Sequence, residues 1–421
     1  MTLSRRQWLQ MSAGAAVAPS PGAPPADPAA ETPPALTALR PMSDGVSPIT
    51  TDEHRGRLRR AQRLLGESGL DALVLASGSS LTYFTGAQWG ESERFFGAVL
   101  TRDGEAAWVT PAFERERALE QVRSGSDVRA WQEDESPYDL VAAILRDRGV
   151  AAGRIGVDET VPFAFVDGIA KAAPAARLES GTPVTAGCRV IKDTHEIALM
   201  RRAGEITMAA HRAVFASLKE GMTQAAASRL SADAHRRLGM AGGALVLFGP
   251  DAAFPHGTTR PWPLQRGDVV LIDGGGRLHG YASDITRTAV FGAAPTDRQL
   301  TIWDVVRRAQ AAAFQAARPG AEAQAVDAAA RQVIEDAGFG PGYKYFTHRV
   351  GHGIGMDGHE WTYLVRGNTT KLRPGMCFSD EPGIYVPGEL GVRHEDIIVI
   401  TETGADNMTK WSGSPEDPAV V

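Results

Sequence analysis

The sequence predicts an α/β domain followed by a larger α+β domain, and three observations support this fold class. The chain has 421 residues, enough for about two or three domains. Over residues 49–187, short apolar runs alternate with helical patterns, as in α/β folds. Over residues 188–421, helices and strands still alternate but without regular strand–helix–strand spacing, which favours α+β.

The smaller domain is expected to begin with a helix shortly after Thr51. Apolar residues from Leu58 to Leu65 recur at helical spacing, acidic residues occupy the first turn, and Gly69 can end the helix. The Gly- and Ser-rich segment 78–86 is interpreted as a turn-rich loop. Apolar runs bounded by turn residues predict strands at 71–77, 95–101, 105–111 and 154–159, and 162–173 is typical of a helix.

The larger domain is expected to open with a long helix within 188–221. Residues from Ile197 to Leu218 follow a helical stripe, and Gly221 comes directly after the pattern. Further helical patterns cover 223–238, 297–318 and 322–337. Glycine-bounded apolar runs predict strands at 243–249, 268–276, 286–292, 376–387 and 394–404.

The composition limits the classes of function. Hydrophobic residues make up 43% of the chain and charged residues 22%, which indicates an ordinary globular protein. The net charge of −6 argues against a nucleic-acid partner, which would favour a basic face. The chain contains no apolar run of about 18 residues, so no membrane span is expected. Cys188 and Cys377 match no metal-binding spacing, and we expect two unpaired, partly buried thiols.

The N-terminus resembles an export signal. Residues 4–10, SRRQWLQ, resemble a twin-arginine signal, and residues 16–18, AVA, form a small-x-small cleavage pattern. The alternative is a disordered basic tail, because the apolar stretch is short. Residues 19–48 are rich in Pro and Ala, so 1–48 is expected to be a signal and a disordered leader. The signal predicts a periplasmic or otherwise exported protein; without it, the protein would be cytoplasmic.

Four carboxylates stand beside apolar runs of the larger domain. Asp273 ends one run and Asp284 follows eleven residues later. Glu381 precedes a Pro-Gly turn, and Glu395 enters another apolar run. Each alone has an ordinary explanation, as a turn residue or a salt-bridge partner. If the four converge, their repulsion would raise their pKa values, and two divalent cations would neutralise them.

Convergence with an imidazole would also select the type of metal. Carboxylate oxygens and one histidine nitrogen suit Mn²⁺, Co²⁺ or Zn²⁺ rather than a thiolate-selected metal, and we expect Mn²⁺. Two such ions about 3.5–4 Å apart can hold a hydroxide and a scissile carbonyl between them. The residues by themselves leave the convergence open.

Five motifs in this order resemble a known signature. Asp273, Asp284, His352, Glu381 and Glu395, within IDGGG, SDITRT, GHGIG, EPGIY and VRHED, resemble the metal ligands of the pita-bread metallopeptidases. That superfamily includes methionine aminopeptidase, aminopeptidase P and prolidase. The resemblance implies a pita-bread catalytic domain at 188–421, preceded by a creatinase/prolidase-type domain at 49–187.

The resemblance also implies a role for each ligand. Asp273 would chelate one metal, and Asp284 and Glu395 would bridge the two. His352 and Glu381 would complete the second metal site. A hydroxide bridging the metals would be the nucleophile, and Glu381 would assist proton transfer. The metals would contribute by lowering the pKa of bound water towards about 7.

Other residues are implied to act on the substrate. His256 and His359 are implied to contact it and to take part in catalysis. His348 is implied to bind it as well, unless its side chain faces away. Arg393 resembles an arginine beside the bridging glutamate and is included among the substrate-binding residues, while Tyr385 would orient nearby groups.

Glycines separate the histidines in FTHRVGHGIGMDGHEW, residues 346–361. Gly351, Gly353 and Gly355 argue against a helix carrying two zinc ligands four residues apart. They favour an extended backbone that passes close to the metals. The glycines therefore make His352 the expected ligand in a strand rather than in a helix.

The extra domain narrows the choice within the superfamily. Methionine aminopeptidases usually lack such a domain and creatinase lacks the metal ligands, so the resemblance favours a prolidase that cleaves Xaa-Pro dipeptides. Arg366 can pair with the C-terminal carboxylate of a dipeptide, although an exposed loop arginine is the simpler interpretation. Prolidase-like enzymes are commonly dimers, so we expect a small peptide substrate and a homodimer.

Three alternatives stay open at this point. Aminopeptidase P cleaves longer peptides with proline in second place. A dinuclear hydrolase can also act on another bond, such as an organophosphate ester. The same fold also serves as a non-catalytic peptide-binding module, although the metal ligands are typically lost there. Metal content after purification and a substrate panel would distinguish these classes.

Overall fold

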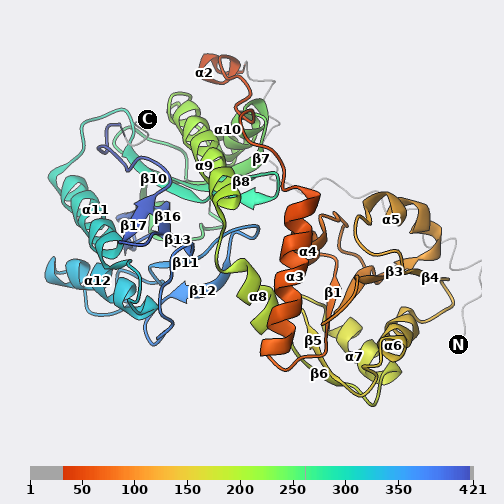
Figure 1. Cartoon of the computed structure of the whole chain (residues 1–421). Coiled ribbons are helices and arrows are strands. Elements are labelled where there is room, and N and C mark those ends of the chain that lie inside the picture. Colours follow the sequence, from red (N-terminus) through yellow and green to blue (C-terminus); the bar gives the residue numbers. More distant parts are fainter. Residues whose placement is uncertain (1–31, 261, 418–421) are drawn as a thin grey trace, which may run out of the picture.

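The computed structural model describes residues 32–260 and 262–417, which form two domains (Figure 1). The predicted export signal, residues 4–10 and 16–18, lies outside the described residues. Mixed helices and strands in both domains confirm the predicted fold class. No helix within the described ranges is long and apolar enough to cross a membrane.

The first domain is built on a six-stranded sheet in the order β4-β3-β2-β1-β5-β6. β2 pairs antiparallel with β1 and β3, and the other pairs are parallel. The strands are β1 (Ala72–Ala76), β2 (Gly97–Thr101), β3 (Ala107–Pro111), β4 (Val128–Trp131), β5 (Arg154–Val157) and β6 (Arg177–Ser180). The four strands predicted from apolar runs are β1, β2, β3 and β5, and all four predictions are confirmed.

Helices pack on both faces of this sheet. Leu73 and Leu75 of β1 belong to the core under α3 and α8, whereas Val74 belongs to the core under α6 and α7. The predicted first helix is α3, which begins with a capping box formed by Thr50 and Glu53. The helices are α3 (Thr51–Glu67), α4 (Ser79–Thr85), α5 (Arg115–Gln121), α6 (Pro137–Asp147), α7 (Phe163–Ala172) and α8 (Thr182–Arg189), with a 3-10 turn at Ala112–Glu114.

The loop predicted at 78–86 is wrong, because most of it forms helix α4. Leu81 and Phe84 are fully buried, so tertiary packing stabilises a helix whose first residues favour turns. Gly86 ends it in the left-handed conformation, with φ of 76°. Helix α4 matters for the site because Ser79, at its N-terminal end, donates to Asp357 of the second domain.

The second domain places helices against two separate sheets. The strands are β7 (Ala241–Phe248), β8 (Val269–Leu278), β9 (Tyr281–Ala282), β10 (Ile285–Val290), β11 (Gly351–Gly353), β12 (Glu360–Leu364), β13 (Cys377–Asp380), β14 (Gly383–Val386), β15 (Leu390–Arg393), β16 (Asp396–Ile400) and β17 (Ala405–Asn407). One sheet has the order β10-β8-β7 and the other β12-β11-β13-β16-β17, while β14 and β15 form a hairpin. The four predicted helices are α9 (Thr194–Phe215), α10 (Gln224–Arg237), α11 (Asp297–Ala316) and α12 (Ala323–Asp336).

The two sheets meet where the candidate ligands lie. α9 and α10 pack on β7 and β8, and α11 and α12 pack on each other and on the second sheet. Thr286 of β10 exchanges two backbone hydrogen bonds with Glu395, at the entry of β16, at 3.3 and 3.2 Å. This short bridge joins the sheets and brings their polar ends together.

The leader is shorter than predicted, because residues 32–48 are folded. Helix α2 (Pro34–Thr37) lies against α9 and α10 (Figure 1). Leu36 is fully buried there beside Ala203 and Ile206. An apolar slot between two helices binds one leucine of a segment that is otherwise rich in Pro and Ala, and the composition of 19–48 gave no sign of it.

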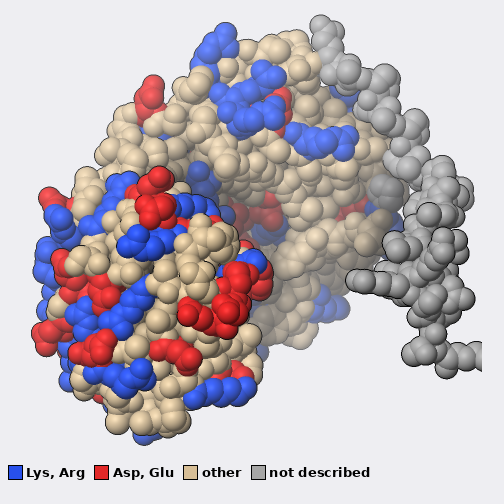
Figure 2. All heavy atoms as spheres, turned by 90° about the vertical axis from the view of Figure 1, so that its right-hand side faces the viewer, with Lys and Arg blue, Asp and Glu red and all other residues tan. Residues whose placement is uncertain are grey.

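Charged side chains of both signs are mixed on the surface that Figure 2 shows. Lys and Arg are interspersed with Asp and Glu over the near lobe in Figure 2, without a broad area of one sign on that face. The first domain contains ion pairs such as Arg94–Glu133 and Arg129–Asp127. Cys188 and Cys377 are unpaired, as predicted, but they are fully rather than partly buried.

Candidate metal centre

Five elements bring the five predicted ligands to one place. Asp273 lies in β8 and Asp284 just before β10, in the first sheet of the domain. His352 lies in β11, Glu381 directly follows β13, and Glu395 directly precedes β16, in the second sheet. Strand ends and the short bridge between the sheets therefore set the geometry.

The ligand atoms form two overlapping groups. Within each group, all candidate ligand atoms lie within 4.8 Å of one another. One group consists of Asp273, Asp284 and Glu395, and the other of His352, Glu381 and Glu395. Two groups that share one carboxylate are the arrangement expected of a pair of metal ions with a bridging ligand.

The electrostatics of the cluster favour bound cations. Removal from water, followed by the negative charges of Asp273 and Glu381, raises the pKa of Asp284 to about 7. Burial and the same crowding raise the pKa of Glu395 well above its usual range. Divalent ions would remove both penalties, and four carboxylates with one imidazole are a fitting donor set for them.

Glu381 behaves differently from the other acids. Burial would raise its pKa, but the hydrogen bond with His352 and the charges of His348 and Arg393 lower the pKa to about 2. Ser379 Oγ also donates to Glu381 Oε1 at 3.0 Å. Glu381 is therefore ionised at neutral pH even without a metal.

Local hydrogen bonds fix the ring of His352. Its Nδ1 lies 3.0 Å from the carbonyl oxygen of Gly353, to which it donates. Nε2 lies 3.3 Å from Glu381 Oε1 and can donate to it in the metal-free chain, whereas a bound metal ion would take the place of that proton. A histidine ligand with its second nitrogen donating to a carbonyl is typical of metal sites.

Glycines let the backbone reach this position. A Cβ on Gly351 would lie 2.0 Å from the carbonyl oxygen of Ser379, and one on Gly353 would lie 2.7 Å from that of Glu360. The extended strand predicted around His352 is confirmed as β11, and its glycines allow the neighbouring strands to approach. Gly355 is different: its Cβ would meet the Glu360 carboxylate at 2.8 Å, away from the ligands.

Comparison with known proteins places this cluster in a family. The model of metallopeptidase family M24 matches residues 198–402, and the model of the creatinase/prolidase N-terminal domain matches 57–191. A probable dipeptidase PepE of Mycobacterium bovis is 38% identical over 358 residues, covering 83% of this chain and 92% of the relative. The chain belongs to metallopeptidase family M24.

Further relatives agree with this assignment. An Xaa-Pro dipeptidase of Lactobacillus delbrueckii subsp. lactis is 35% identical, over 84% of this chain and 97% of the relative. The crystal structure of dipeptidase PepE from Mycobacterium ulcerans superposes with a TM-score of 0.81 at 36% identity, covering 88% of this chain and 99% of that one. The protein is thus a peptidase of the M24 family with a pita-bread catalytic domain, as the motifs indicated.

The guanidinium of Arg393 in this M24 enzyme binds other side chains of the same chain. It forms an ion pair with Asp273, donates from Nη1 to the Tyr385 hydroxyl at 2.8 Å and from Nε to Thr286 Oγ1 at 3.1 Å. The Thr286 hydroxyl lies 2.7 Å from Asp273 Oδ1 and 2.6 Å from Glu395 Oε2, so it can donate to either. With these contacts Arg393 supports the candidate ligand Asp273 and the Thr286 hydroxyl beside it.

His348 is held in a similar way. Nδ1 lies 2.8 Å from the carbonyl oxygen of Arg349, and Nε2 lies 2.7 Å from the Tyr385 hydroxyl. Both ring nitrogens are therefore engaged within the protein. Nδ1 is also 3.9 Å from Glu381 Oε2, so the ring borders the centre without a nitrogen left for a substrate.

His359 and His256 lie at the open side of the centre. The ring of His359 is exposed and lies 4.0 Å from the ring of His352. Desolvation is the main cause of the lowered pKa of His359, and the charge of His352 also lowers it. His256 is exposed as well. His359 can also join Asp284 and His352 as a third group of ligand atoms within 4.8 Å.

Two arginines differ in their surroundings. Arg366 was singled out from the sequence, whereas Arg349 was not. The guanidinium of Arg366 is over the ring of Tyr343, beside α12. The guanidinium of Arg349 is 4.1 Å from the ring centre of Tyr363, and its charge helps lower the pKa of His359. No described residue forms an ion pair with Arg349.

The register of β11 and β12 places Tyr363, which contacts Arg349, on the same face of the sheet as His352. Tyr363 of β12 pairs directly with His352 of β11, and directly opposed residues of an antiparallel pair project from the same face. Tyr363 and Trp361 are both exposed, at 37% and 43%. Only the pairing of two short strands reveals this arrangement, so no signal in the sequence alone could have found it.

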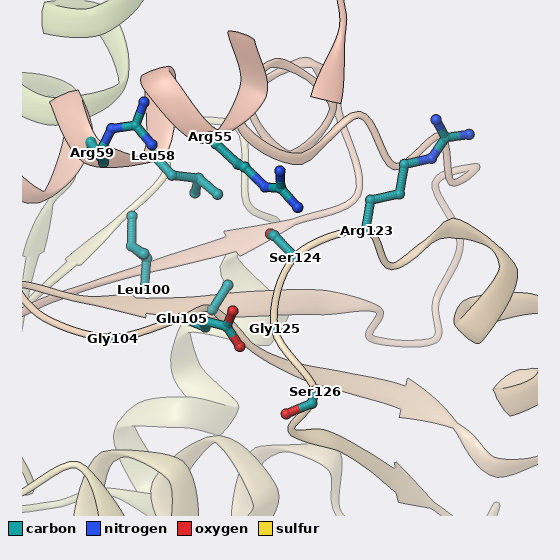
Figure 3. Close-up of a pocket in the computed structure, with 11 residues that line it drawn as sticks. Arg55, Leu58, Arg59, Leu100, Gly104, Glu105, Arg123, Ser124, Gly125 and Ser126 are labelled. Carbon is teal, nitrogen blue, oxygen red and sulfur yellow. The ribbon is translucent and has the colours of Figure 1, made fainter. Parts of the chain in front are cut away.

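A separate hollow lies on the first domain. It has a volume of about 410 Å³ and lies between α3 and the loop 123–126 (Figure 3). Arg55 points towards Ser124, whereas the guanidinium groups of Arg59 and Arg123 point away (Figure 3). None of its lining residues belongs to the ligand cluster, and its arginines do not converge on a common point.

Proposed function

We propose that this M24 peptidase is an Xaa-Pro dipeptidase that hydrolyses the bond before proline with two divalent metal ions. The observation that carries the proposal is the convergence of five ligands into two groups that share Glu395. The relatives named as dipeptidases and Xaa-Pro dipeptidases support the choice of substrate.

The proposed metal sites follow the two groups. Asp273, Asp284 and Glu395 would hold one ion. His352 and Glu381 would hold the other, with the bridging carboxylates Asp284 and Glu395 shared. Bound ions would acidify a water molecule and polarise the scissile carbonyl. The oxygen-rich donor set suits Mn²⁺, with Co²⁺ and Zn²⁺ as alternatives.

The protein's own groups would then move protons and hold the substrate. Glu381 is ionised, and its Oε1 is already held by Ser379, which leaves Oε2 to accept a proton from the attacking water and pass it to the proline nitrogen. His359 would donate to the carbonyl oxygen as it becomes negative, a contact worth about 3–4 kcal/mol in other enzymes. His256 would also contact the substrate.

Arg349 supports a dipeptide rather than a longer peptide. A dipeptide ends in a carboxylate near the metals, and an arginine without an ion pair beside the active face suits that charge. Arg366 was the arginine expected for this role, but its guanidinium lies over Tyr343. We therefore propose Arg349 as the carboxylate contact and retain Arg366 as the second candidate.

The decisive experiment is a substrate panel with defined metals. Xaa-Pro dipeptides, the same dipeptides with an amidated C-terminus, Xaa-Pro-Yaa peptides and a phosphotriester would be compared with Mn²⁺, Co²⁺ and Zn²⁺. Preference for free dipeptides supports the proposal. Preference for longer peptides would indicate aminopeptidase P, and phosphotriester turnover alone would indicate another hydrolase. Absence of metal and of all turnover would indicate a binding module.

Arg349→Met tests the carboxylate contact, with Arg366→Met as the matched control. We expect Arg349→Met to raise KM for the free dipeptide about tenfold or more and to leave the amidated dipeptide nearly unchanged, because only the former carries the charge. If Arg366→Met alone raises KM, the original assignment of Arg366 stands instead.

We also propose three features of the whole chain. We propose domain limits at 49–187 and 188–421, although helix α8 (Thr182–Arg189) crosses that limit and 32–48 packs on the second domain. We also propose a homodimer, to be checked by light scattering. The twin-arginine motif supports export to the periplasm, and otherwise the enzyme would be cytoplasmic.

A further inference from the structure

A buried ion cluster lies beneath the loop that carries His359. Glu360, directly after that histidine, accepts from Arg189 Nη2 at 2.5 Å and from Lys192 Nζ at 2.9 Å. These three residues are 5–7% exposed. A carboxylate between two buried cations lies at the junction of the two domains, because Arg189 ends α8 and Lys192 precedes α9.

The Glu360 carboxylate also binds the backbone at the start of its own loop. Its Oε1 also accepts from the backbone nitrogens of Met356 and Asp357, at 2.9 and 3.2 Å. The same carboxylate therefore holds the first residues of the segment 356–360 and its last. His359 lies inside this closed segment, one residue from the carboxylate that closes it.

The first domain holds the loop from its other side. Arg189 Nη2 also binds Asp357 Oδ2 at 2.6 Å, and Ser79 Oγ at the start of α4 donates to Asp357 Oδ1 at 2.5 Å. Arg189 Nη1 donates to Ser80 Oγ at 3.1 Å. Helix α4 of the first domain and helix α8, which crosses the proposed domain limit, thus fasten a loop of the second domain.

Gly355 leaves the space that the ion cluster occupies. A Cβ on Gly355 would lie 2.8 Å from both Glu360 carboxylate oxygens and 2.8 Å from Lys192 Cε. The third glycine of GHGIG therefore accommodates the ion cluster and not the metal ligands. A buried ion pair is rarely better for stability than apolar packing, so its value here lies in fixing a geometry.

We propose that Glu360, held by Arg189 and Lys192, is a positioning residue that fixes His359 over the metal centre. The first domain takes part in this clamp through Ser79, which binds Asp357, and Ser80, which binds Arg189. The inference rests on the proposed role of His359 as a contact of the reacting carbonyl, and it adds the device that holds that contact in place.

Glu360→Gln keeps the size of the side chain and removes its charge. We expect kcat on the preferred peptide to fall about 10–100-fold, as for other groups that orient a catalytic side chain, with little change in KM and no loss of metal. In a His359→Ala background the same change should cost less than about twofold, because there is no histidine left to position. Hydrogen exchange at 356–359 should become faster.

Glu196→Gln is the matched control. Glu196 is equally buried and pairs with Arg57 of the first domain at 3.2 Å, and glutamine keeps its capping bond to the backbone of Asp193. It removes an interdomain ion pair without touching the segment 356–360. We expect kcat and the exchange of that segment to stay near the wild-type values.

Several outcomes would overturn the proposal. Equal losses from Glu360→Gln with and without His359 would show a role independent of that histidine. Loss of metal in Glu360→Gln would also overturn the proposal. So would a fall of kcat in Glu196→Gln equal to that in Glu360→Gln. If Glu360→Gln does not fold, Arg189→Met replaces it in the same cycle. The cycle uses whichever peptide the wild type hydrolyses, so failure of the dipeptidase assignment appears in the substrate panel and not here.

Discussion

The contribution of Asp284 to the stability of the metal-free enzyme should fall as the pH rises from about 4 to about 7. Asp284 has a pKa of about 7 in the folded chain against an ordinary value of 3.8, because it is desolvated and faces Asp273 and Glu381. The folded state therefore binds a proton that the unfolded state has already lost. The stabilisation is complete below pH 3.8 and is lost as the pH rises through about 7.

The magnitude follows from the two pKa values. One pH unit corresponds to about 1.4 kcal/mol, so the difference between 3.8 and about 7 corresponds to about 4 kcal/mol. That is a large part of the roughly 5–15 kcal/mol by which domains are stable. Divalent cations bound to the ionised carboxylates should remove this loss, because they replace the proton as the neutralising charge.

The assay is urea unfolding at several pH values between 4 and 8. Chelator-treated wild type, the same protein with Mn²⁺, and chelator-treated Asp284→Asn would be compared. The buried His211 and His394 have pKa values lowered to about 3, mainly by burial, so they act in the opposite direction below pH 6.5. The quantity of interest is therefore the difference between wild type and Asp284→Asn.

The reasoning would be refuted by a metal-free wild type whose stability, relative to Asp284→Asn, is constant or rises between pH 4 and 7. It would also be refuted if Mn²⁺ stabilised both proteins equally. Either result would mean that Asp284 is not crowded by the other carboxylates in the folded chain.

The remaining predictions concern three other features. His359→Ala should lower kcat by about 100-fold with two metals retained, and metal loss measured by mass spectrometry would make His359 a ligand. Leu36→Ala should lower the free energy of unfolding by about 2 kcal/mol or more in urea titrations, since the side chain is fully buried; no change would mean that α2 is not docked in solution. Arg5→Lys with Arg6→Lys should leave precursor in the cytoplasm on fractionation, and unchanged export would exclude the twin-arginine signal.

Strands and long helices could be predicted because their signals are local. β1, β2, β3 and β5 follow from apolar runs, and the stripe in α9 follows from a 3.6-residue period. The helix α4 was missed because its first residues favour turns, while the packing of Leu81 and Phe84 depends on distant elements. Helix α2 was missed for the same reason, since Leu36 is buried by two helices that follow it by more than 150 residues.

The candidate ligands could be found because each stands in its own short motif. Their order and types indicated two metals before any distance was known. The supporting residues could not be sorted in this way. Arg393 and His348 match family positions, but only their contacts with Asp273, Tyr385 and Thr286 show that their nitrogens are already used.

The sequence by itself therefore determined the fold class, the family and the five candidate ligands, because local apolar patterns and short motifs encode them. The tertiary structure decided what surrounds these ligands. Arg349 lies over Tyr363, which the register of β11 and β12 sets opposite His352. Glu360 reaches Arg189 across 171 residues of chain, and a buried charge finds such a partner only when folding removes both from water.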